Sequence, residues 1–242
     1  MKIALIGTGR MGSAIEQKAL ADGDEVVLKV NRENRAEISP ALLQKSDVAI
    51  EFTEPGSAVT NLLWCLDNGV PVVCGTTGWN NELEGVYRRF KEENGSLIVS
   101  SNFSIGVNLL FRLNQQLAAW MNNHREYHPD ITETHHTRKL DKPGGTALTL
   151  VSQVLDTSER FRSWALIEEG RTLQEDMIPV TAHRTGDVVG EHQVRWTSPV
   201  DELSISHKAF TRDGFAAGAL LAARWIADKK GVYTMADVLF GR

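Results

Sequence analysis

The chain has 242 residues, and its 26 Lys and Arg against 31 Asp and Glu give a formal net charge of −5. A content of 42% hydrophobic and 24% charged residues is typical of a folded globular protein and argues against disorder. The acidic balance argues against nucleic acid as the main partner, although it leaves room for a local basic site that binds an anionic substrate.

Neither the cysteines nor the apolar segments indicate secretion or a membrane. Cys65 and Cys74 are too few for a disulfide framework and are not spaced as zinc ligands. The apolar run before Gly7 is too short for a signal peptide. The most apolar late segment, residues 215–227, contains Arg224 and is shorter than the roughly 20 residues of a membrane helix. The sequence therefore predicts a cytoplasmic protein with no membrane partner.

Short apolar runs alternate with helical patterns in residues 1–103. Ser57 is the expected N-cap of one helix, and Gly69 follows the end of that helix. Because strands alternate with helices, we expect βαβ units with right-handed crossovers and a parallel sheet. The predicted strands are residues 2–6, 25–30, 47–52, 70–74 and 96–100, and the predicted helices are residues 11–21, 57–68 and 81–93.

The pattern changes after residue 103. A long amphipathic helix is predicted over residues 107–122, because apolar residues recur near helical spacing. These residues are Leu109, Leu110, Leu113, Leu117 and Trp120. Strand-like segments follow with less helix between them, at residues 130–135, 178–184, 191–197 and 203–209.

The last of these segments alternates, so that Leu203, Ile205, His207 and Ala209 share a face. This indicates an antiparallel or mixed sheet with one face covered by helices or by a partner subunit. An apolar-faced helix is expected over residues 216–229.

The pattern as a whole predicts an α/β fold with a Rossmann-like parallel-sheet domain and an α+β domain that contains a mixed sheet. We expect residues 1–103 and 215–242 to form the dinucleotide-binding domain and residues 104–214 to form the second domain.

The first strand ends in a G-x-G-x-x-G pattern that opens a helix, which is the context of a dinucleotide-binding loop. In such a loop Gly7 permits the tight turn, Gly9 lets the backbone approach a pyrophosphate, and Gly12 permits close packing of helix on strand. The helix N-terminus supplies N–H groups for the anion. The alternative is a glycine turn with no nucleotide. The expected cofactor-binding residues here are Gly7, Thr8, Gly9, Arg10, Met11 and Gly12.

The end of the second predicted strand suggests which nucleotide binds. Many NAD enzymes place Asp or Glu there, but this chain has Asn31 and Arg32, with Arg35 nearby. Asn lacks the carboxylate that repels a 2′-phosphate, and Arg pairs with phosphate. We therefore expect NADPH to be accepted, whereas the simpler alternative makes Arg32 and Arg35 solvated surface residues.

Two further loops follow strands at the sheet edge where ligands bind in open α/β proteins. Gly75, Thr76 and Thr77 follow residues 70–74, and Asn102 and Phe103 follow residues 96–100. Each loop taken alone could be an ordinary turn.

Residues 133–146 contain the most informative segment, with basic side chains concentrated in an acidic protein. His135, His136, Arg138, Lys139 and Lys142 fall within eight residues, and a glycine pair then opens a helix near Thr146. Lys, Arg and helix N–H groups hold carboxylates, and His transfers protons near neutral pH. The segment therefore suits an anionic substrate.

The alternatives for this segment are a solvated charged face or a metal site. The Pro-Gly-Gly turn into a helix disfavours a solvated face. No Cys cluster or H-E-x-x-H pattern accompanies the histidines, so we expect no metal. We expect His183, His192 and His207 to be structural or to lie at a subunit contact, and we assign them no functional role.

Together these motifs resemble one family, the 4-hydroxy-tetrahydrodipicolinate reductases, also called dihydrodipicolinate reductases, over essentially the whole chain. The segment at residues 135–146 is highly specific, whereas many dehydrogenases share the glycine loop. The other matching segments are residues 51–53, 75–78, 100–108, 184–192, 207–209, 215–219 and 233–235.

The resemblance implies that NADH or NADPH reduces a small cyclic dicarboxylate to tetrahydrodipicolinate in the diaminopimelate route of lysine biosynthesis. It also implies a homotetramer assembled by the second domain, which binds the substrate. His135 matches the family's proton donor and acceptor, and Lys139 matches its proton donor. The matching substrate contacts are His136, Lys139, Gly145 and Thr146, and further matching cofactor contacts are Gly75, Thr76, Thr77, Ser100, Ser101, Asn102 and Phe103.

Two departures from the family pattern affect these expectations. Gly144 stands where the family often has Ser, and Asn31 stands where it often has an acidic residue. Two other functions fit the same residues: another NAD(P)-dependent imine or carboxylate reductase, and a non-catalytic NAD(P)-sensing regulator. The set of His135, Lys139, Gly145 and Thr146 argues against the regulator, because sensing a nucleotide does not require it.

Overall fold

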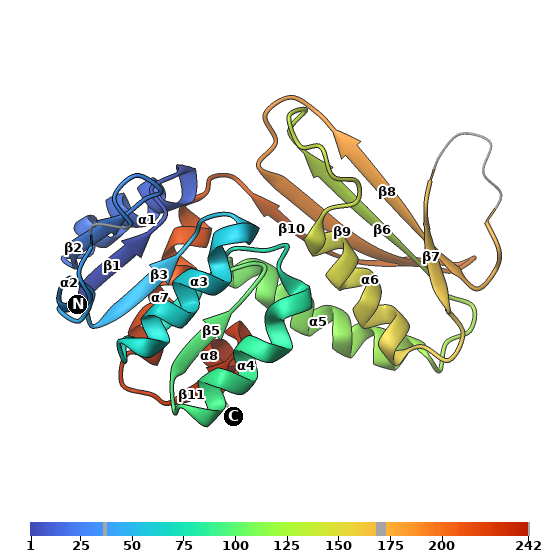
Figure 1. Ribbon diagram of the computed structural model, residues 1–242. Coiled ribbons are helices and arrows are strands. Elements are labelled where there is room, and N and C mark those ends of the chain that lie inside the picture. Colours follow the sequence, from blue (N-terminus) through green and yellow to red (C-terminus); the bar gives the residue numbers. More distant parts are fainter. Residues whose placement is uncertain (36–37, 168–172, 242) are drawn as a thin grey trace. The chain divides into compact units, whose positions relative to one another are not determined.

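In the computed structural model, which describes residues 1–35, 38–167 and 173–241, the chain forms two units (Figure 1). One unit consists of Met1–Ile105 with Arg212–Arg242, and the other of Gly106–Thr211. Each unit contains its own sheet.

The first unit is built on a six-stranded parallel sheet in the order β11-β5-β4-β3-β1-β2. The order reverses at β1, because β2 pairs with one side of it and β3 with the other. Such a reversal creates the crevice where ligands bind beyond the carboxyl ends of the strands. The strands are β1 (Lys2–Ile6), β2 (Glu25–Val30), β3 (Val48–Glu51), β4 (Val72–Cys74), β5 (Ser96–Val99) and β11 (Gly231–Tyr233).

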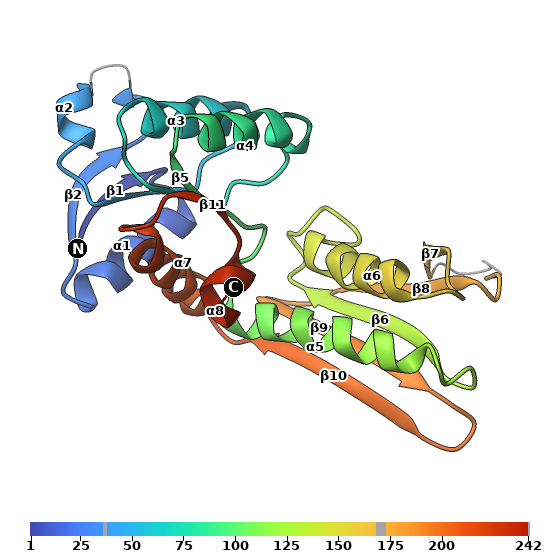
Figure 2. The same ribbon diagram turned by 90° about the horizontal axis from the view of Figure 1, so that it is seen from below.

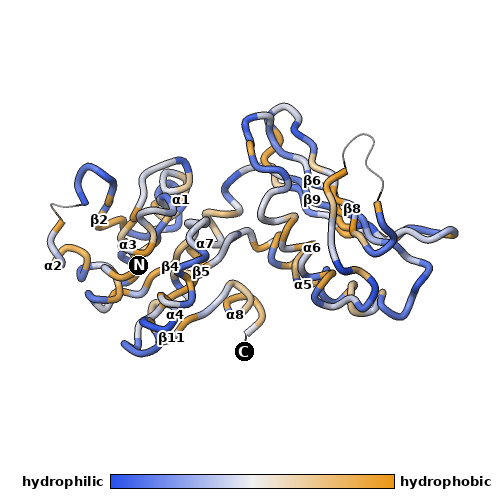
Figure 3. Tube along the Cα trace, turned by 45° about the vertical axis from the view of Figure 1, so that its right-hand side comes forward, coloured by the Kyte–Doolittle hydropathy of each residue, from blue (hydrophilic) through white to orange (hydrophobic). Residues whose placement is uncertain are grey.

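Helices cover both faces of this sheet. On one face lie α1 (Arg10–Ala21), α7 (Asp213–Ile226) and α8 (Met235–Phe240), and on the other α3 (Pro55–Asp67) and α4 (Leu83–Glu92) (Figure 2). Side chains of β1, β3, β4 and β5 alternate between the two cores, which explains why these strands are largely apolar along their length. Figure 3 shows hydrophobic residues along α7, in keeping with the buried residues of that helix.

Two short helices complete this unit, α2 (Pro40–Leu43) and a 3₁₀ turn (Asn80–Glu82). The start of α3 corrects the expectation for Ser57. Pro55 occupies the first turn and Glu54 is the N-cap, so Ser57 lies inside the helix. The fixed φ of proline suits the first helical position, and this preference outweighs that of serine for the cap.

The second unit contains a five-stranded mixed sheet in the order β10-β9-β6-β8-β7. The pairs β10·β9 and β9·β6 are antiparallel, whereas β6·β8 and β8·β7 are parallel. The strands are β6 (His128–His135), β7 (Ser163–Leu166), β8 (Met177–Arg184), β9 (Gly190–Thr197) and β10 (Glu202–Ala209).

One face of this sheet packs against α5 (Ile105–Met121) and α6 (Gly145–Thr157) (Figure 2). In β10, Leu203, Ile205 and His207 pair with Trp196, Val194 and His192 of β9, so they share the face that carries buried Val194 and Trp196. None of the described helices combines the length and apolar composition needed to cross a membrane.

The predicted apolar stripe of α5 is only partly buried. Leu110 and Leu117 enter the core, whereas Leu109, Leu113 and Trp120 are 46%, 57% and 64% exposed. A helix on one side of a sheet buries a stripe, and these three side chains fall outside it.

Candidate functional site

The glycine loop has the conformation that its sequence pattern predicts. Gly7 has a φ of +101°, and a Cβ there would lie 2.0 Å from the carbonyl oxygen of Phe52. A Cβ on Gly12 would lie 2.0 Å from the carbonyl oxygen of Gly7, so a larger residue would push α1 off the strand. A Cβ on Gly9 would meet nothing within 4 Å. Gly7 and Gly12 are therefore required by packing, while Gly9 borders open space.

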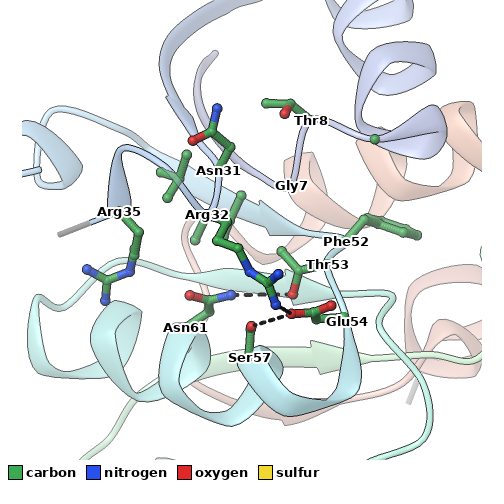
Figure 4. Close-up of a pocket in the computed structure, with 13 residues that line it drawn as sticks. Gly7, Thr8, Asn31, Arg32, Arg35, Phe52, Thr53, Glu54, Ser57 and Asn61 are labelled. Carbon is green, nitrogen blue, oxygen red and sulfur yellow. Dashed lines mark hydrogen bonds and ion pairs between the residues drawn. The ribbon is translucent and has the colours of Figure 1, made fainter. Parts of the chain in front are cut away.

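A pocket of about 520 Å³ lies beside this loop, where β1, β2 and β3 end (Figure 4). Of the predicted cofactor residues, Gly7, Thr8, Gly9, Asn31 and Arg32 line it. The others do not line it; these are Arg10, Met11, Gly12, Gly75, Thr76, Thr77, Ser100, Ser101, Asn102 and Phe103.

Two arginines reach this pocket in different ways. Arg32 is 87% exposed at its side chain and places Nη2 2.6 Å from Glu54 Oε1 (Figure 4). Arg35 places its guanidinium carbon 3.7 Å from the ring centroid of Trp64. Among the residues that the structure describes, Arg32 is thus held by one solvated ion pair, which is weak and exchangeable.

The loops after β3, β4 and β5 contact one another. The backbone N–H of Thr53 donates to Thr76 Oγ1 at 2.7 Å, and the rings of Phe52 and Phe103 lie 5.6 Å apart. A Cβ on Gly75 would lie 2.1 Å from the ring of Phe52, so this glycine allows the loops to meet. The loops after β4 and β5 therefore support the pocket-lining segment that follows β3.

Asn102 is anchored within its own loop. Its carbonyl accepts from Ser100 Oγ at 2.7 Å, and its Oδ1 accepts from the N–H of Ser104 at 2.9 Å.

The glycine loop and the pocket together fit a dinucleotide. The left-handed turn at Gly7 and the open space at Gly9 suit a phosphate beside the start of α1. Asn31 and Arg32 stand at the end of β2, where the adenosine ribose is bound in Rossmann folds.

In the second unit, strand register brings charged residues onto one face of the sheet. Glu133 on β6 lies opposite His192 on β9, and His135 lies beside Arg184 on β8. Because side chains alternate, Glu133 and His135 share the face that carries buried Ile131. This face points toward α5 and α6, so the cluster forms at the edge of an apolar core.

Glu133 is fully buried and accepts hydrogen bonds at both carboxylate oxygens. Arg184 Nη2 donates to Oε1 at 2.8 Å, and the backbone N–H of Gly144 donates to Oε2 at 3.0 Å. Arg184 also donates to the carbonyl oxygens of Lys139 and Asp141. The carboxylate and the guanidinium thereby fix the loop that leads from β6 to α6.

Two histidines lie against the same carboxylate. His135 Nδ1 is 3.6 Å and His192 Nε2 is 3.8 Å from Glu133 Oε2. Burial lowers the pKa of His135, while the charge of Glu133 opposes this shift. Burial, with the charges of neighbouring groups, lowers the pKa of His192 to about 3. His192 is therefore neutral at pH 7, and its approach to Glu133 is not an ion pair.

Lys139 belongs to the same cluster. Its ammonium pairs with Asp141 at 2.7 Å, and its side chain is 23% exposed. A Cβ on Gly144 would lie 2.9 Å from Lys139 Cε and 3.0 Å from Glu133 Oε2, so glycine leaves the space that Lys139 uses. Burial alone would raise the pKa of Asp141, but the hydrogen bond from Lys139 brings it below its usual value.

The predicted substrate contacts lie next to these groups. His136 follows His135 and has a buried Nδ1. Helix α6 begins at Gly145, with Gly144 as its N-cap, so the first turn, including Thr146, presents the positive end of the helix dipole. The structure thus assembles His135, Lys139 and the start of α6 around one loop.

The cluster also has the composition of a cation site, because Glu133, His135 and His192 place one ligand-type atom each within 4.8 Å of one another. However, both oxygens of Glu133 are occupied by donors, one of them a guanidinium. The positive charges of Arg184 and Lys139 would repel a metal ion here. The donors and charges around Glu133 therefore disfavour a metal ion at this cluster.

Sequence reasoning gave no role to Glu133, Arg184, His192 or Glu54. Glu133 and His135 are two residues apart in a strand, which signals a shared face. The contributions of Arg184 and His192 depend on strand register, which the sequence pattern did not reveal. The role of Glu54 could not be predicted, because its contact with Arg32 joins the end of β3 to the end of β2.

Comparisons with known proteins show which family the chain resembles. Residues 1–103 match the family model described as dihydrodipicolinate reductase, N-terminus, and residues 106–239 match the one described as dihydrodipicolinate reductase, C-terminus. A 4-hydroxy-tetrahydrodipicolinate reductase of Christiangramia forsetii is 41% identical over 99% of this chain and 98% of its own length. One of Chromobacterium violaceum is 39% identical over 82% of this chain and 75% of its own.

Among solved structures, the dipicolinate-bound dihydrodipicolinate reductase of Paenisporosarcina sp. TG-14 has a similar fold. It superposes with a TM-score of 0.80 at 21% identity over 97% of each chain. An amine dehydrogenase from Mycobacterium smegmatis gives a TM-score of 0.61 at 12% identity over 97% of this chain and 95% of its own. At these identities the two structures show the fold alone. Because both family models match and a full-length relative is 41% identical, the chain belongs to the dihydrodipicolinate reductase family.

Proposed function

We propose that this protein is a NAD(P)H-dependent 4-hydroxy-tetrahydrodipicolinate reductase of the diaminopimelate route of lysine biosynthesis. Family membership supports the reaction class. The observation that carries the proposal is the cluster in which His135 and Lys139 flank a buried carboxylate beside the start of α6.

In this reaction, the nicotinamide supplies the hydride when the nucleotide is bound. The chain's own residues bind the dicarboxylate and move the proton. Lys139 and the first turn of α6, with Gly145 and Thr146, attract the substrate carboxylates, and His136 contributes a further polar contact. As negative charge develops on the substrate ring, Lys139 stabilises it, and His135 or Lys139 delivers the proton.

For the nucleotide, we infer that the glycine loop and the Arg32 pocket hold either NADPH or NADH. Asn31 carries no charge that would repel a 2′-phosphate. Within the described part of the chain, Arg32 has one ion pair, which is exposed, and its side chain can turn toward that phosphate. The proposal is that NADPH is accepted at least as well as NADH.

In this proposal the two units have different functions. Residues 1–103 and 215–242 bind the nucleotide, and residues 104–214 bind the substrate and assemble a cytoplasmic homotetramer. The mixed sheet supports assembly, because α5 and α6 cover only one of its faces. Exposed Val200 and Phe210, at 86% and 82%, flank β10 at the sheet edge. Sedimentation equilibrium at micromolar concentration tests the proposed homotetramer, and a monomer would refute that assembly.

The activity is tested by following NADPH oxidation with the product of dihydrodipicolinate synthase. Consumption that requires this product supports the proposal. Consumption with other cyclic imine carboxylates but not this one would indicate a different reductase, and nucleotide binding without consumption would indicate a sensor.

A double variant assigns the catalytic groups. We expect His135→Gln with Lys139→Met to lower kcat more than about 100-fold with little change in NADPH affinity. The matched control, His124→Gln with Lys91→Met, removes the same residue types from exposed positions and should retain activity. Equal turnover in the two double variants would refute the assignment.

A further inference from the structure

We propose that Glu133 is a positioning residue for His135. Its carboxylate holds one proton on Nδ1 of His135, and this leaves Nε2 to transfer a second proton to the substrate. This inference rests on the proposed function, because it concerns the group that transfers the proton. It adds a residue that acts through His135 and does not itself touch the substrate.

The geometry of the imidazole supports this assignment. Nδ1 of His135 is buried and has no hydrogen-bond partner among the described residues, and Glu133 Oε2 is the acceptor 3.6 Å away. This distance is longer than a hydrogen bond, and such contacts often tighten when a substrate binds. A neutral imidazole carries one N–H, so a proton held on Nδ1 leaves Nε2 as the basic nitrogen, which takes up a second proton and then delivers that proton to the substrate.

Glu133 is itself held in place from two sides. Arg184 fixes Oε1, and the N–H of Gly144 fixes Oε2 at the start of α6. A carboxylate bound at both oxygens cannot rotate away from His135. Arg184 also holds the backbone carbonyl of Lys139, so the same ion pair keeps both proton-transfer residues in one arrangement.

Neighbouring residues also pack closely against the Nε2 side of the His135 ring. A Cβ on Gly190 would lie 3.3 Å from His135 Nε2, which is a tight contact, so glycine leaves more room at that edge of the ring. The ring of His192 meets that of His135 edge to face, with centroids 5.0 Å apart. His192 is neutral and buried, so it forms a wall of the site and does not compete as a charged donor.

The charges around His135 explain why a carboxylate is needed at this position. Burial lowers the pKa of His135, and the positive charges of Lys139 and Arg184 lower it further. The negative charge of Glu133 opposes both effects. Without Glu133 the imidazole would be a poorer base in a site dominated by cations. The groups that act on His135 or pack in its cluster are Glu133 (β6), Arg184 (β8), His192 (β9), His207 (β10), Lys139 and Asp141.

The test compares Glu133→Gln with Glu191→Gln. Glu191 is on the neighbouring strand β9, faces the other side of the sheet and pairs with exposed Lys208. Both variants remove one negative charge, but only Glu133→Gln removes it beside His135. We expect Glu133→Gln to lower kcat about tenfold or more and to shift the pH limb assigned to His135 downward by about one unit, with NADPH affinity retained. Glu133→Asp keeps the charge and should restore part of both effects.

A direct measurement does not depend on turnover or on the folding of the Glu133 variants. Proton–nitrogen correlation spectra of the ¹⁵N-histidine-labelled wild type report the tautomer of each imidazole, and His135 is assigned by its loss in His135→Gln. We expect the Nδ1–H tautomer for neutral His135. The Nε2–H tautomer would overturn the proposal, as would a Glu133→Gln profile that matches that of Glu191→Gln. If the wild type fails to oxidise NADPH with the synthase product, the proposed function fails, while the tautomer still reports on Glu133.

Discussion

Arg32 Nη2 lies 2.6 Å from Glu54 Oε1 in the pocket of the first unit, and both side chains are mostly exposed. An exposed ion pair contributes less than about 1 kcal/mol, so Arg32 can exchange Glu54 for a stronger partner. A phosphate monoester is such a partner, because it accepts charge-assisted hydrogen bonds from a guanidinium. We therefore expect Glu54 to compete for Arg32 with the 2′-phosphate when NADPH binds.

This competition predicts opposite effects for the two partners of the pair. Arg32→Ala should raise KM for NADPH about tenfold and leave KM for NADH nearly unchanged, because NADH lacks the 2′-phosphate. Glu54→Gln should lower KM for NADPH, since Arg32 is released. Steady-state kinetics with both nucleotides checks this. Arg89→Ala, which removes an arginine from an exposed cluster with Asp67 and Glu93, is the control. An equal effect of Arg32→Ala on both nucleotides would contradict the assignment.

The glycine loop predicts that stability and nucleotide binding can be separated. A Cβ on Gly12 would collide with the backbone of Gly7, whereas one on Gly9 meets nothing within 4 Å. Gly12→Ala should therefore lower the free energy of unfolding by about 1–3 kcal/mol. Gly9→Ala should change it by less than about 0.5 kcal/mol and still weaken NADPH binding, because its Cβ enters the space for the pyrophosphate. Urea unfolding and calorimetric titration measure the two effects. Intact NADPH affinity in Gly9→Ala would place the phosphates elsewhere.

His192 predicts a loss of stability in acid. Its pKa is about 3 in the folded protein, against an ordinary value of 6.5. Below pH 6.5 the unfolded chain binds a proton at His192 while the folded protein does not, and this favours unfolding. The contribution of neutral His192 to stability is therefore complete above pH 6.5 and is lost between pH 6.5 and pH 3. The full contribution is on the order of 5 kcal/mol.

The acid effect is measured by urea unfolding between pH 4 and pH 8, values at which the folded protein keeps His192 neutral. His192→Leu should flatten the dependence of unfolding free energy on pH, because the residue no longer titrates. His124→Gln removes an exposed histidine and should leave the dependence unchanged. If His192→Leu and the wild type lose stability equally toward pH 4, another group is responsible.

The parts of the fold that the sequence predicted well have strong local signals. The runs at β1 and β2 are apolar and bounded by glycine or aspartate, and their ends fall where the pattern placed them. Strand β11 and helix α8 were not predicted, because three and six residues are too short for periodicity to appear. Helix α8 did carry a local signal, since Thr234 and Asp237 form a capping box.

The candidate sites show the same contrast between features with a local sequence signal and features without one. The glycine loop and the basic segment around His135 are contiguous and could be found from residue types alone. The ion pair of Glu133 with Arg184 joins residues 51 positions apart and depends on β6 lying parallel to β8. Residue patterns predict that strands exist, but not which strands pair or in which register, so this part of the site required the structure.

The final prediction concerns Gly144, where the family often carries serine. A Cβ there would lie 2.9 Å from Lys139 Cε and 3.0 Å from Glu133 Oε2. Glu133 is buried and held at both oxygens, so the flexible end of Lys139 must move instead. Gly144→Ala should therefore lower kcat severalfold while changing the free energy of unfolding by less than about 1 kcal/mol. Gly214→Ala, where a Cβ meets nothing within 4 Å, is the matched control and should retain wild-type kcat. If Gly144→Ala also retains wild-type kcat, the position of Lys139 over Gly144 is not needed for turnover.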